Sequence, residues 1–154
     1  METQNNIFGE NYVGKPYQRI FVSPAEKDQF VKNYIKLFNA KIEYVFRIKE
    51  YYNLMVIGFN SPIGDVSLVV IEPSDLLKLP DYIQHTKVMY VVDSIDQVYE
   101  NATKNDIKIL QKRTPNIMGA QGRLELATGY IIELAETTNK DLFVSDPYNI
   151  DFNI

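Results

Sequence analysis

The sequence predicts an α+β protein built from two copies of one β-α-β-β-β unit. Several short runs are rich in apolar and β-branched residues, two longer segments repeat apolar residues at helical spacing, and these segments occur in the same order twice. The corners at 22–24 and 92–94, where a strand leads into a helix, are equivalent points 70 residues apart. In such a duplicated unit, the helix covers one face of the strands and the second copy must cover the other.

The first unit, about residues 17–72, opens with a strand over 17–22. A helix follows, because Ser23 is a capping residue, Pro24 suits the first helical position and Glu26 suits a capping box. The helix carries an apolar stripe, which indicates that one of its faces packs against the core. Three strand-like runs complete the unit, over 42–48, 54–59 and 65–71.

Residues 73–86 form a connector that contains two prolines, and the pattern then restarts. The second unit, about residues 87–136, opens with a strand over 87–92, and either Asp93 or Ser94 caps its helix. Three strand-like runs follow, over 107–112, 123–127 and 130–135. The loop between the first two of these runs is expected to contain Pro115, Gly119 and Gly122.

Composition excludes several classes of function. The 154 residues suffice for one domain with a core of its own, and they include no cysteine and a single histidine, His85. Disulfides, thiolate zinc sites, cysteine nucleophiles and catalysis by a histidine pair within one chain are therefore excluded. The net charge of −4 argues against nucleic-acid binding, which needs clustered basic residues. No apolar run approaches the roughly 20 residues that span a bilayer, and no signal-peptide pattern is present, so we expect a cytoplasmic protein that does not bind membranes.

The stretch GYIIELAE, residues 129–136, places a carboxylate in the middle of an apolar strand. Because side chains alternate along a strand, Ile131, Glu133 and Ala135 point to one face, and their neighbours point to the other. The face that carries Glu133 therefore either meets water or lines a pocket.

Residues 87–136 resemble one module of the vicinal oxygen chelate superfamily, which includes glyoxalases, extradiol dioxygenases and bleomycin-type antibiotic-binding proteins. The resemblance rests on Ile95-Asp96 at an acidic corner, a glycine-rich loop, and a final strand with Ile132-Glu133-Leu134. Residues 19–46 resemble the opening of the partner module, with an aromatic pair on the helix at Phe30 and Tyr34. Together the two stretches extend over roughly residues 17–136. The resemblance implies two modules whose strands form a half-open, mixed β-sheet cup with the helices outside.

The resemblance also implies that Glu133 points into the cup, at one of four metal-ligand positions. Equal counts along the strands place two other positions at Tyr17 and Lys87, and the fourth falls on Val70 or Glu72. Tyrosine, lysine and valine are poor ligands for a divalent metal. We therefore expect Lys87 to pair with Glu133 inside the cup, because a buried carboxylate needs a partner.

Two functions from different classes follow from these residues. The first is a binding protein without a metal, similar to the dimeric antibiotic-binding members, which holds a small and partly flat organic molecule in the cup. The residues expected to bind this molecule are Glu133, Lys87, Tyr17, Arg123 and Tyr90. The second is a lyase, isomerase or dioxygenase that binds manganese, iron, nickel or zinc through Glu133, Glu72 and His85.

Other possibilities stay open at this stage. Arg123 lies either in the cup or on a half-exposed strand with cross-strand ion pairs. A third candidate is a regulatory or structural protein, in which the cup is filled by its own side chains. Residues 137–154 carry several apolar side chains, and we expect 142–144 to pack on the cup, the connector or a second subunit, the alternative being a disordered tail.

Overall fold

The computed structural model describes residue 8 and residues 11–145. Eight strands form one sheet with the order β2-β3-β4-β1-β5-β8-β7-β6. The strands are β1 (Tyr12–Val22), β2 (Lys41–Ile48), β3 (Leu54–Asn60), β4 (Asp65–Val70), β5 (Thr86–Val92), β6 (Lys108–Pro115), β7 (Gly119–Ala127) and β8 (Tyr130–Thr137). The helices are α1 (Lys27–Phe38), α2 (Pro73–Leu76), α3 (Asp81–Gln84) and α4 (Ile95–Lys104), with short 3-10 turns η2 (Pro24–Glu26) and η3 (Lys140–Leu142). The predicted α+β class with an open mixed sheet is confirmed.

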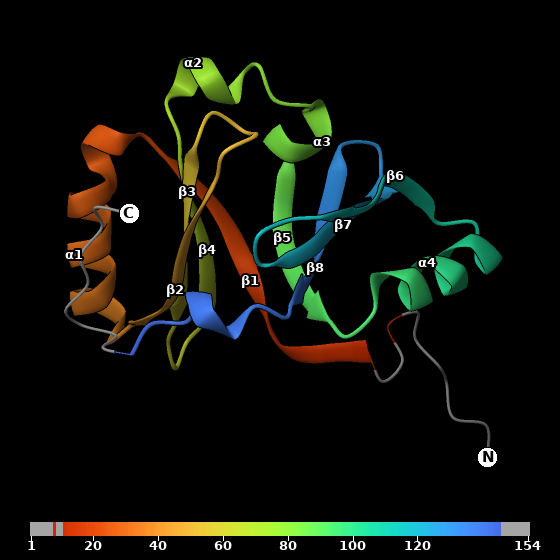
Figure 1. Ribbon diagram of the computed structural model, residues 1–154, viewed down its shortest axis with the longest axis horizontal. Coiled ribbons are helices and arrows are strands. Elements are labelled where there is room, and N and C mark those ends of the chain that lie inside the picture. Colours follow the sequence, from red (N-terminus) through yellow and green to blue (C-terminus); the bar gives the residue numbers. More distant parts are fainter. Residues whose placement is uncertain (1–7, 9–10, 146–154) are drawn as a thin grey trace.

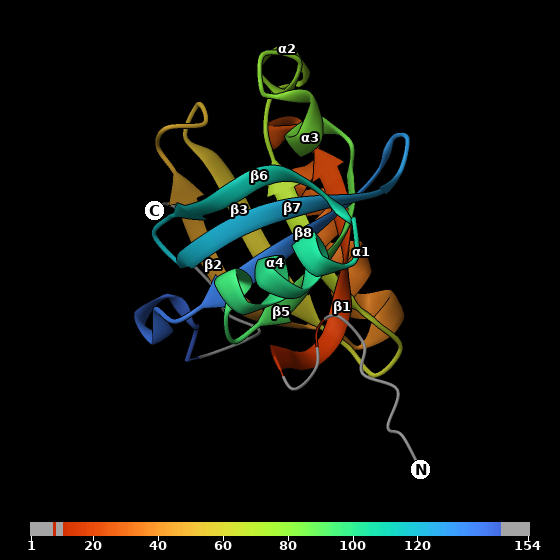
Figure 2. The same ribbon diagram turned by 90° about the vertical axis from the view of Figure 1, so that its right-hand side faces the viewer.

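Strand pairing divides the sheet into two β-α-β-β-β modules. In each module the first strand pairs in parallel with the last, β1 with β4 and β5 with β8, and the remaining pairs are antiparallel. Antiparallel pairing of β1 with β5 joins the modules at the centre of the sheet. Helices α1 and α4 lie at opposite ends of the molecule, and α2 and α3 lie together at one edge (Figure 1). A quarter turn brings α4 to the front, with β6, β7 and β8 behind it (Figure 2).

The two long helices begin in different ways. Helix α4 is capped by the Ser94 side chain, which accepts a hydrogen bond from the Gln97 main-chain N–H. Of the two predicted caps, Ser94 is therefore the one used. Helix α1 is entered through η2, and the Ser23 side chain makes no capping hydrogen bond. Asn39 ends α1 in the left-handed conformation with φ of 51°, a common way to stop a helix.

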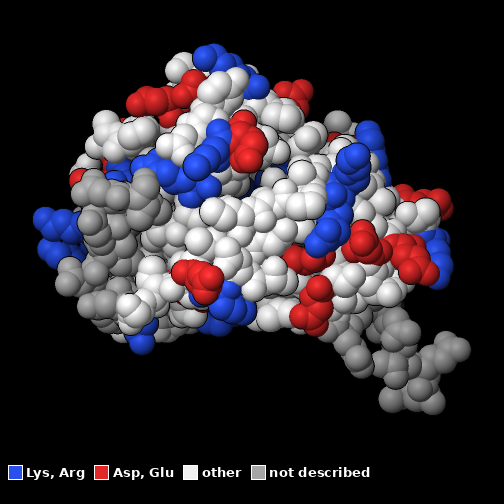
Figure 3. All heavy atoms as spheres, viewed as in Figure 1, with Lys and Arg blue, Asp and Glu red and all other residues white. Residues whose placement is uncertain are grey.

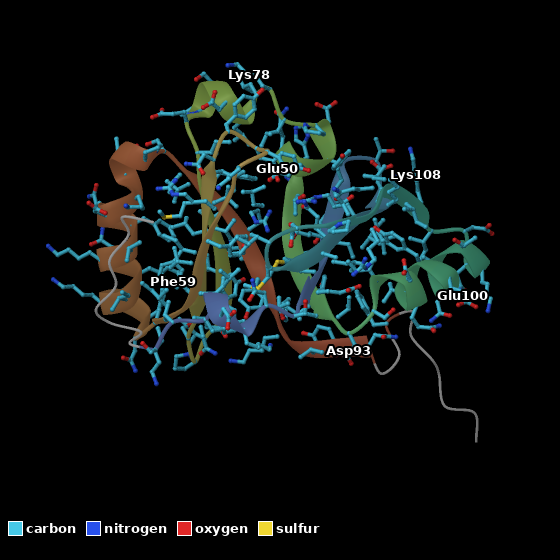
Figure 4. The ribbon with its side chains drawn as sticks, in the orientation of Figure 1. Glu50, Phe59, Lys78, Asp93, Glu100 and Lys108 are labelled. Carbon is cyan, nitrogen blue, oxygen red and sulfur yellow. The ribbon has the colours of Figure 1, made fainter. Side chains whose placement is uncertain are left out.

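Apolar side chains form three cores because each strand contributes alternate residues to its two faces. One core lies between α1 and the first module and includes Phe59, which packs against Phe30 and Tyr34 of α1 (Figure 4). A second core lies between α4 and the second module. The third core fills the inner, concave side of the sheet, and we call this space the cup. Its buried members include Tyr17, Tyr44, Phe46, Val56, Val69, Met89, Val91, Met118 and Ala135.

Several strand ends differ from the sequence prediction, and β6 continues to Pro115, which was expected in the loop. Strand β1 begins five residues early, at Tyr12, because its start pairs with the end of β5 at Val91 and Val92. Strand β7 begins at Gly119, so Gly119 and Gly122 belong to the strand and not to the loop. Gly122 lies against the hydroxyl end of the Tyr99 side chain of α4, where a β-carbon would collide with it. These glycines reflect close packing rather than a turn.

The segment after β8 packs against β2. Phe143 pairs with Tyr44 through an isolated β-bridge and an edge-to-face ring contact, and the Val144 N–H donates to the Glu43 carbonyl. Leu142 and Phe143 pack against the core of the cup as expected, whereas Val144 packs against the core beside α1. Residues 146–154 of the predicted extension lie outside the described residues. No helix within the described part of the chain is long and apolar enough to cross a bilayer.

Candidate functional site

The four central strands each direct one side chain to the same point in the cup. Arg19 on β1 is paired in register with Ser67 on β4, and Met89 on β5 is paired with Glu133 on β8. Arg19 Nη2 lies 2.8 Å from Glu133 Oε1, 3.3 Å from Ser67 Oγ and 3.9 Å from Met89 Sδ. A guanidinium group therefore occupies the centre of this set of four residues.

A second arginine holds the same carboxylate oxygen. Arg123 on β7 directs its Nη2 to Glu133 Oε1 at 2.8 Å, and its side chain is only 2% exposed. Its other nitrogens donate to Thr86 Oγ1 at 2.9 Å, Gln111 Oε1 at 2.7 Å and Gln121 Oε1 at 2.8 Å. This network of neutral acceptors compensates for the burial of Arg123.

Opposing electrostatic effects set the ionisation of these groups. Burial alone raises the pKa of Glu133, but the neighbouring Arg19 and Arg123 outweigh it and hold this pKa below its ordinary value of 4.5. Burial lowers the pKa of Arg123, and the Glu133 carboxylate opposes this change. The charged side chains that line the cavity are these three, so its wall carries one positive charge in excess.

The cavity at this point has a volume of about 50 Å³, which is room for a few water molecules. Its walls are mostly apolar and aromatic, with contributions from Phe21, Tyr44, Phe46, Tyr51, Leu54, Val56, Val69, Ile83 and Met118. An adjoining hollow of about 500 Å³ lies between the β2–β3 turn and the β6–β7 turn, and we call it the outer hollow. Four residues line both spaces, namely Ile48, Tyr51, Asn116 and Gln121. The outer hollow therefore borders the cavity, and we take it as the entrance.

Charged side chains surround a largely uncharged band across the face shown in Figure 3. Glu50, labelled in Figure 4, belongs to the turn between β2 and β3 and lines the outer hollow. Arg47 and Lys49 line the same hollow. The entrance thus carries one more basic than acidic side chain.

Three of the predicted binding residues lie on the cup side. Glu133 and Arg123 meet in the cavity, so Arg123 lies in the cup, and its ion pair with Glu133 is a cross-strand pair between β7 and β8. Tyr17 belongs to the core of the cup, but it lies outside the cavity wall, and its hydroxyl donates to Glu43 Oε1 at 2.6 Å.

The predicted positions of Lys87 and Tyr90 are wrong. Lys87 is exposed, because the pairing of β5 with β8 is irregular between Thr86 and Val88, and Glu133 pairs with arginines instead. Tyr90 lies on the opposite face of β5 from the cup, where its ring contacts Phe8 and Tyr12. Both errors concern which residue of an alternating strand points inward.

The alternative set of metal ligands is not brought together. Glu72 and His85 are exposed in the connector, and His85 Nδ1 lies 3.0 Å from the Asp81 carbonyl oxygen. Val70, the other choice for the fourth position, packs in the core beside α1. Among the described residues, no three histidine, cysteine or acidic side chains are grouped so that they could hold a metal ion.

Sequence reasoning missed Arg19, Ser67 and Met89. Arg19 and Met89 are each two residues nearer the helix than Tyr17 and Lys87, and like those residues they are 70 apart. The repeat therefore contained the signal, and the count along each strand stopped two residues too far from the helix.

Comparison with known proteins gives similarity in structure alone. No protein-family model matches the chain, and no curated protein matches it in sequence. Methylmalonyl-CoA epimerase from Mycobacterium tuberculosis has 11% identity and a TM-score of 0.62, over 84% of this chain and 92% of that one. An uncharacterised protein from Methanosarcina mazei has 14% identity and a TM-score of 0.59, over 80% and 92%. A mutant of 4-hydroxymandelate synthase from Streptomyces coelicolor has 8% identity and a TM-score of 0.54, over 91% and 44%.

The epimerase and the synthase are members of the vicinal oxygen chelate superfamily. The chain has the vicinal oxygen chelate fold. At identities this low the likeness shows the fold and not the chemistry. The residues in the centre of the cup must therefore decide which activity this chain supports.

The residues present do not fit the metal site that this fold implies. The set of four contains one carboxylate, a hydroxyl, a thioether and a guanidinium, whereas manganese, iron, nickel and zinc in proteins prefer imidazole and carboxylate donors. The positive charge of Arg19 also lies where a cation would have to bind. Glu133 is neutralised by arginines and is thus a poor metal ligand.

Proposed function

We propose that this chain binds a small organic molecule in the cup without a metal ion. The observation that carries this proposal is the Arg19–Glu133 pair, 2.8 Å apart at the centre of the cup. The pair supplies polar groups for recognition and leaves the set of four without the donors of a metal site.

The homodimer expected from the resemblance belongs to the same proposal, and light scattering of the purified protein tests it.

The walls of the cavity support binding of a small organic molecule. Small-molecule sites are usually concave and apolar, with a few polar groups that fix orientation. The cavity combines aromatic walls with Arg19, Ser67 and Glu133, and the outer hollow leads into it. A partly flat molecule would contact the rings of Phe21, Tyr51 and their neighbours.

The small cavity volume, about 50 Å³, favours a second candidate, in which the cup is filled by its own side chains and binds nothing. The proposed function instead requires side chains at the entrance to move when a molecule enters. Binding sites commonly change rotamers in this way. The two candidates therefore differ in whether the cup responds to added molecules.

Methionine methyl groups provide a direct test. Met89 and Met118 line the cavity, whereas Met55 is buried in the core beside α1 and is a matched internal control. Protein labelled with ¹³C at the methionine methyls is screened against flat aromatic and aliphatic molecules in the presence of a chelator. The proposal expects hits that saturate and that shift Met89 and Met118 but not Met55. If a broad panel shifts neither cup methyl, the cup does not bind small molecules and the second candidate is correct.

A further inference from the structure

Arg19 contains a buried donor that the protein does not satisfy. Its Nε has no hydrogen-bond partner, and within the described part of the chain no other buried side-chain nitrogen or oxygen shares this property. The Arg19 side chain is 5% exposed and lines the cavity. Buried donors without partners are rare in folded proteins because they lose their bonds to water and gain nothing in return. Because Arg19 lines the cavity, a water or ligand held there is the available acceptor for this N–H.

The charge of the cavity specifies what that partner carries. Two guanidinium groups share a single carboxylate oxygen, Glu133 Oε1, so one positive charge is left without a counter-charge. Arg123 donates through its Nε and both of its Nη atoms, whereas the Arg19 Nε has no acceptor. Arg19 is therefore the arginine that has a donor left for an added negative group. A single negative charge on the ligand would neutralise it.

A carboxylate matches this position better than a phosphate. It carries one negative charge, it is planar, and arginine binds it through short, charge-assisted hydrogen bonds. A phosphate group brings up to two negative charges, which exceeds the single positive charge that the cavity wall offers. Beyond the carboxylate the walls are apolar, with Phe21, Phe46 and Met118 among them.

We infer that the ligand is a monocarboxylate with an aromatic or aliphatic body, and that its carboxylate accepts the Arg19 Nε–H. This inference rests on the proposed function and names its ligand class. The body of the molecule lies along the apolar wall and extends toward the outer hollow. Arg47, Lys49 and Glu50 give the outer hollow a net charge of one positive unit, which attracts anions toward the entrance. Arg19 is then the residue that determines specificity for the acid.

Matched acids and amides test this inference. The probes are benzoate, 3-phenylpropionate and octanoate, each compared with its neutral primary amide of nearly the same shape, and phenylphosphonate serves as the phosphate-like probe. Affinities are measured by titration of the Met89 and Met118 methyl signals. We expect the acid to bind at least about tenfold more tightly than its amide, because a charged hydrogen bond replaces a neutral one.

Variants assign the preference to Arg19. Arg19→Met is expected to bring the acid and the amide to within about twofold of each other, since the charged donor is gone. Lys87→Met removes an exposed cation outside the cup, and the preference for the acid is expected to remain. A measurement on the unaltered protein does not depend on the folding of either variant. The ¹⁵N signal of the Arg19 Nε–H is expected to shift on addition of an acid and to stay in place with its amide.

The outcomes separate the inference from the proposed function. Binding of amides as tightly as acids, tighter binding of phenylphosphonate, or an unchanged Arg19 Nε–H signal overturns the carboxylate assignment while the cup remains a binding site. Binding of other neutral molecules from the panel, with no acid bound, does the same. Absence of any cup response to any molecule overturns the inference and the proposed function together.

Discussion

The two modules share one topology and differ in chemistry at the equivalent positions. In the first module the central pair is Arg19 with Ser67, a cation beside a hydroxyl, and in the second it is Met89 with Glu133, a thioether beside a carboxylate. The repeat therefore fixes where four side chains meet but not what they carry. Because the cation and the carboxylate come from different modules, their ion pair connects the modules across the β1–β5 seam.

The two modules also differ in the contacts that stabilise the start of their long helices, α1 and α4. Glu136 on β8 accepts a hydrogen bond from the Ile95 main-chain N–H at the start of α4 and forms an ion pair with Arg113. The stretch 129–136 thus contains two acids with separate tasks, one in the cup and one at a helix end. At the start of α1, η2 takes the place of a side-chain cap, since the Ser23 side chain makes no capping bond.

Glu133→Gln is expected to have the largest effect on stability. It leaves two buried guanidinium groups without their counter-charge, and removal of one partner from a buried pair costs about 3–5 kcal/mol. Equilibrium unfolding in urea measures this loss. Lys87→Gln is the matched control, and because Lys87 is exposed its effect is expected to stay within about 0.5 kcal/mol. A large loss in both variants would instead support the Lys87–Glu133 pair predicted from the sequence.

The two arginines are expected to differ in their contribution to stability. Arg123→Met leaves Glu133 and three neutral acceptors short of a donor, and a cost of about 3 kcal/mol is expected. Arg19→Met leaves Glu133 paired with Arg123 and removes the unpartnered Nε, so its cost is expected to be at least about 1 kcal/mol smaller. Urea unfolding of both variants provides the comparison. Equal losses would mean that Arg19 is as fully satisfied as Arg123.

The contribution of Glu133 to the pH dependence of stability can be separated from that of the other acids by comparison with Glu133→Gln. Its pKa in the folded protein lies below 4.5, so its contribution is complete above pH 4.5 and is lost as the pH falls through the folded-state value. The stability difference between the natural protein and Glu133→Gln should therefore narrow as the pH falls below 4.5. Urea unfolding of both proteins at a series of pH values measures the difference. A difference that widens toward acid pH would show that the carboxyl group is protonated in the cup.

The smallest effects are expected at the helix starts, where the modules again differ. Ser94→Ala removes a capping hydrogen bond and should cost about 1 kcal/mol. Ser23→Ala removes no such bond and should change stability by less than about 0.5 kcal/mol. Thermal and urea unfolding of the two variants provide the comparison, and equal costs would show that Ser23 also caps its helix in solution.

Local patterns in the sequence were sufficient to predict most of the fold. Alternation along β8 predicted that Glu133 and Ala135 share a face, and both belong to the inner side of the sheet. The restart of the pattern after the connector predicted two equivalent modules. These features depend on neighbours within one strand or helix, which the sequence shows directly.

The partners of Glu133 could not be predicted in the same way. Arg19 is 114 residues away in the chain, and its contact with Glu133 depends on the register of β1 against β5 and of β5 against β8. A shift of one residue exchanges Met89 for Tyr90 on the inner face, and the irregular pairing at Lys87 turns that lysine outward. Strand register is fixed by packing between distant segments, so no local pattern contains it.

The central claim is that Arg19 occupies the place where a metal ion would bind in the cup. Calorimetric titration of the chelator-treated protein with manganese, iron, nickel and zinc tests this claim most directly. The geometry predicts no stoichiometric binding of any of these ions, and Glu133→Gln should behave like the natural protein. Tight binding of one equivalent of a metal that is lost in Glu133→Gln would contradict this interpretation, because Arg19 would then have to leave the centre of the cup.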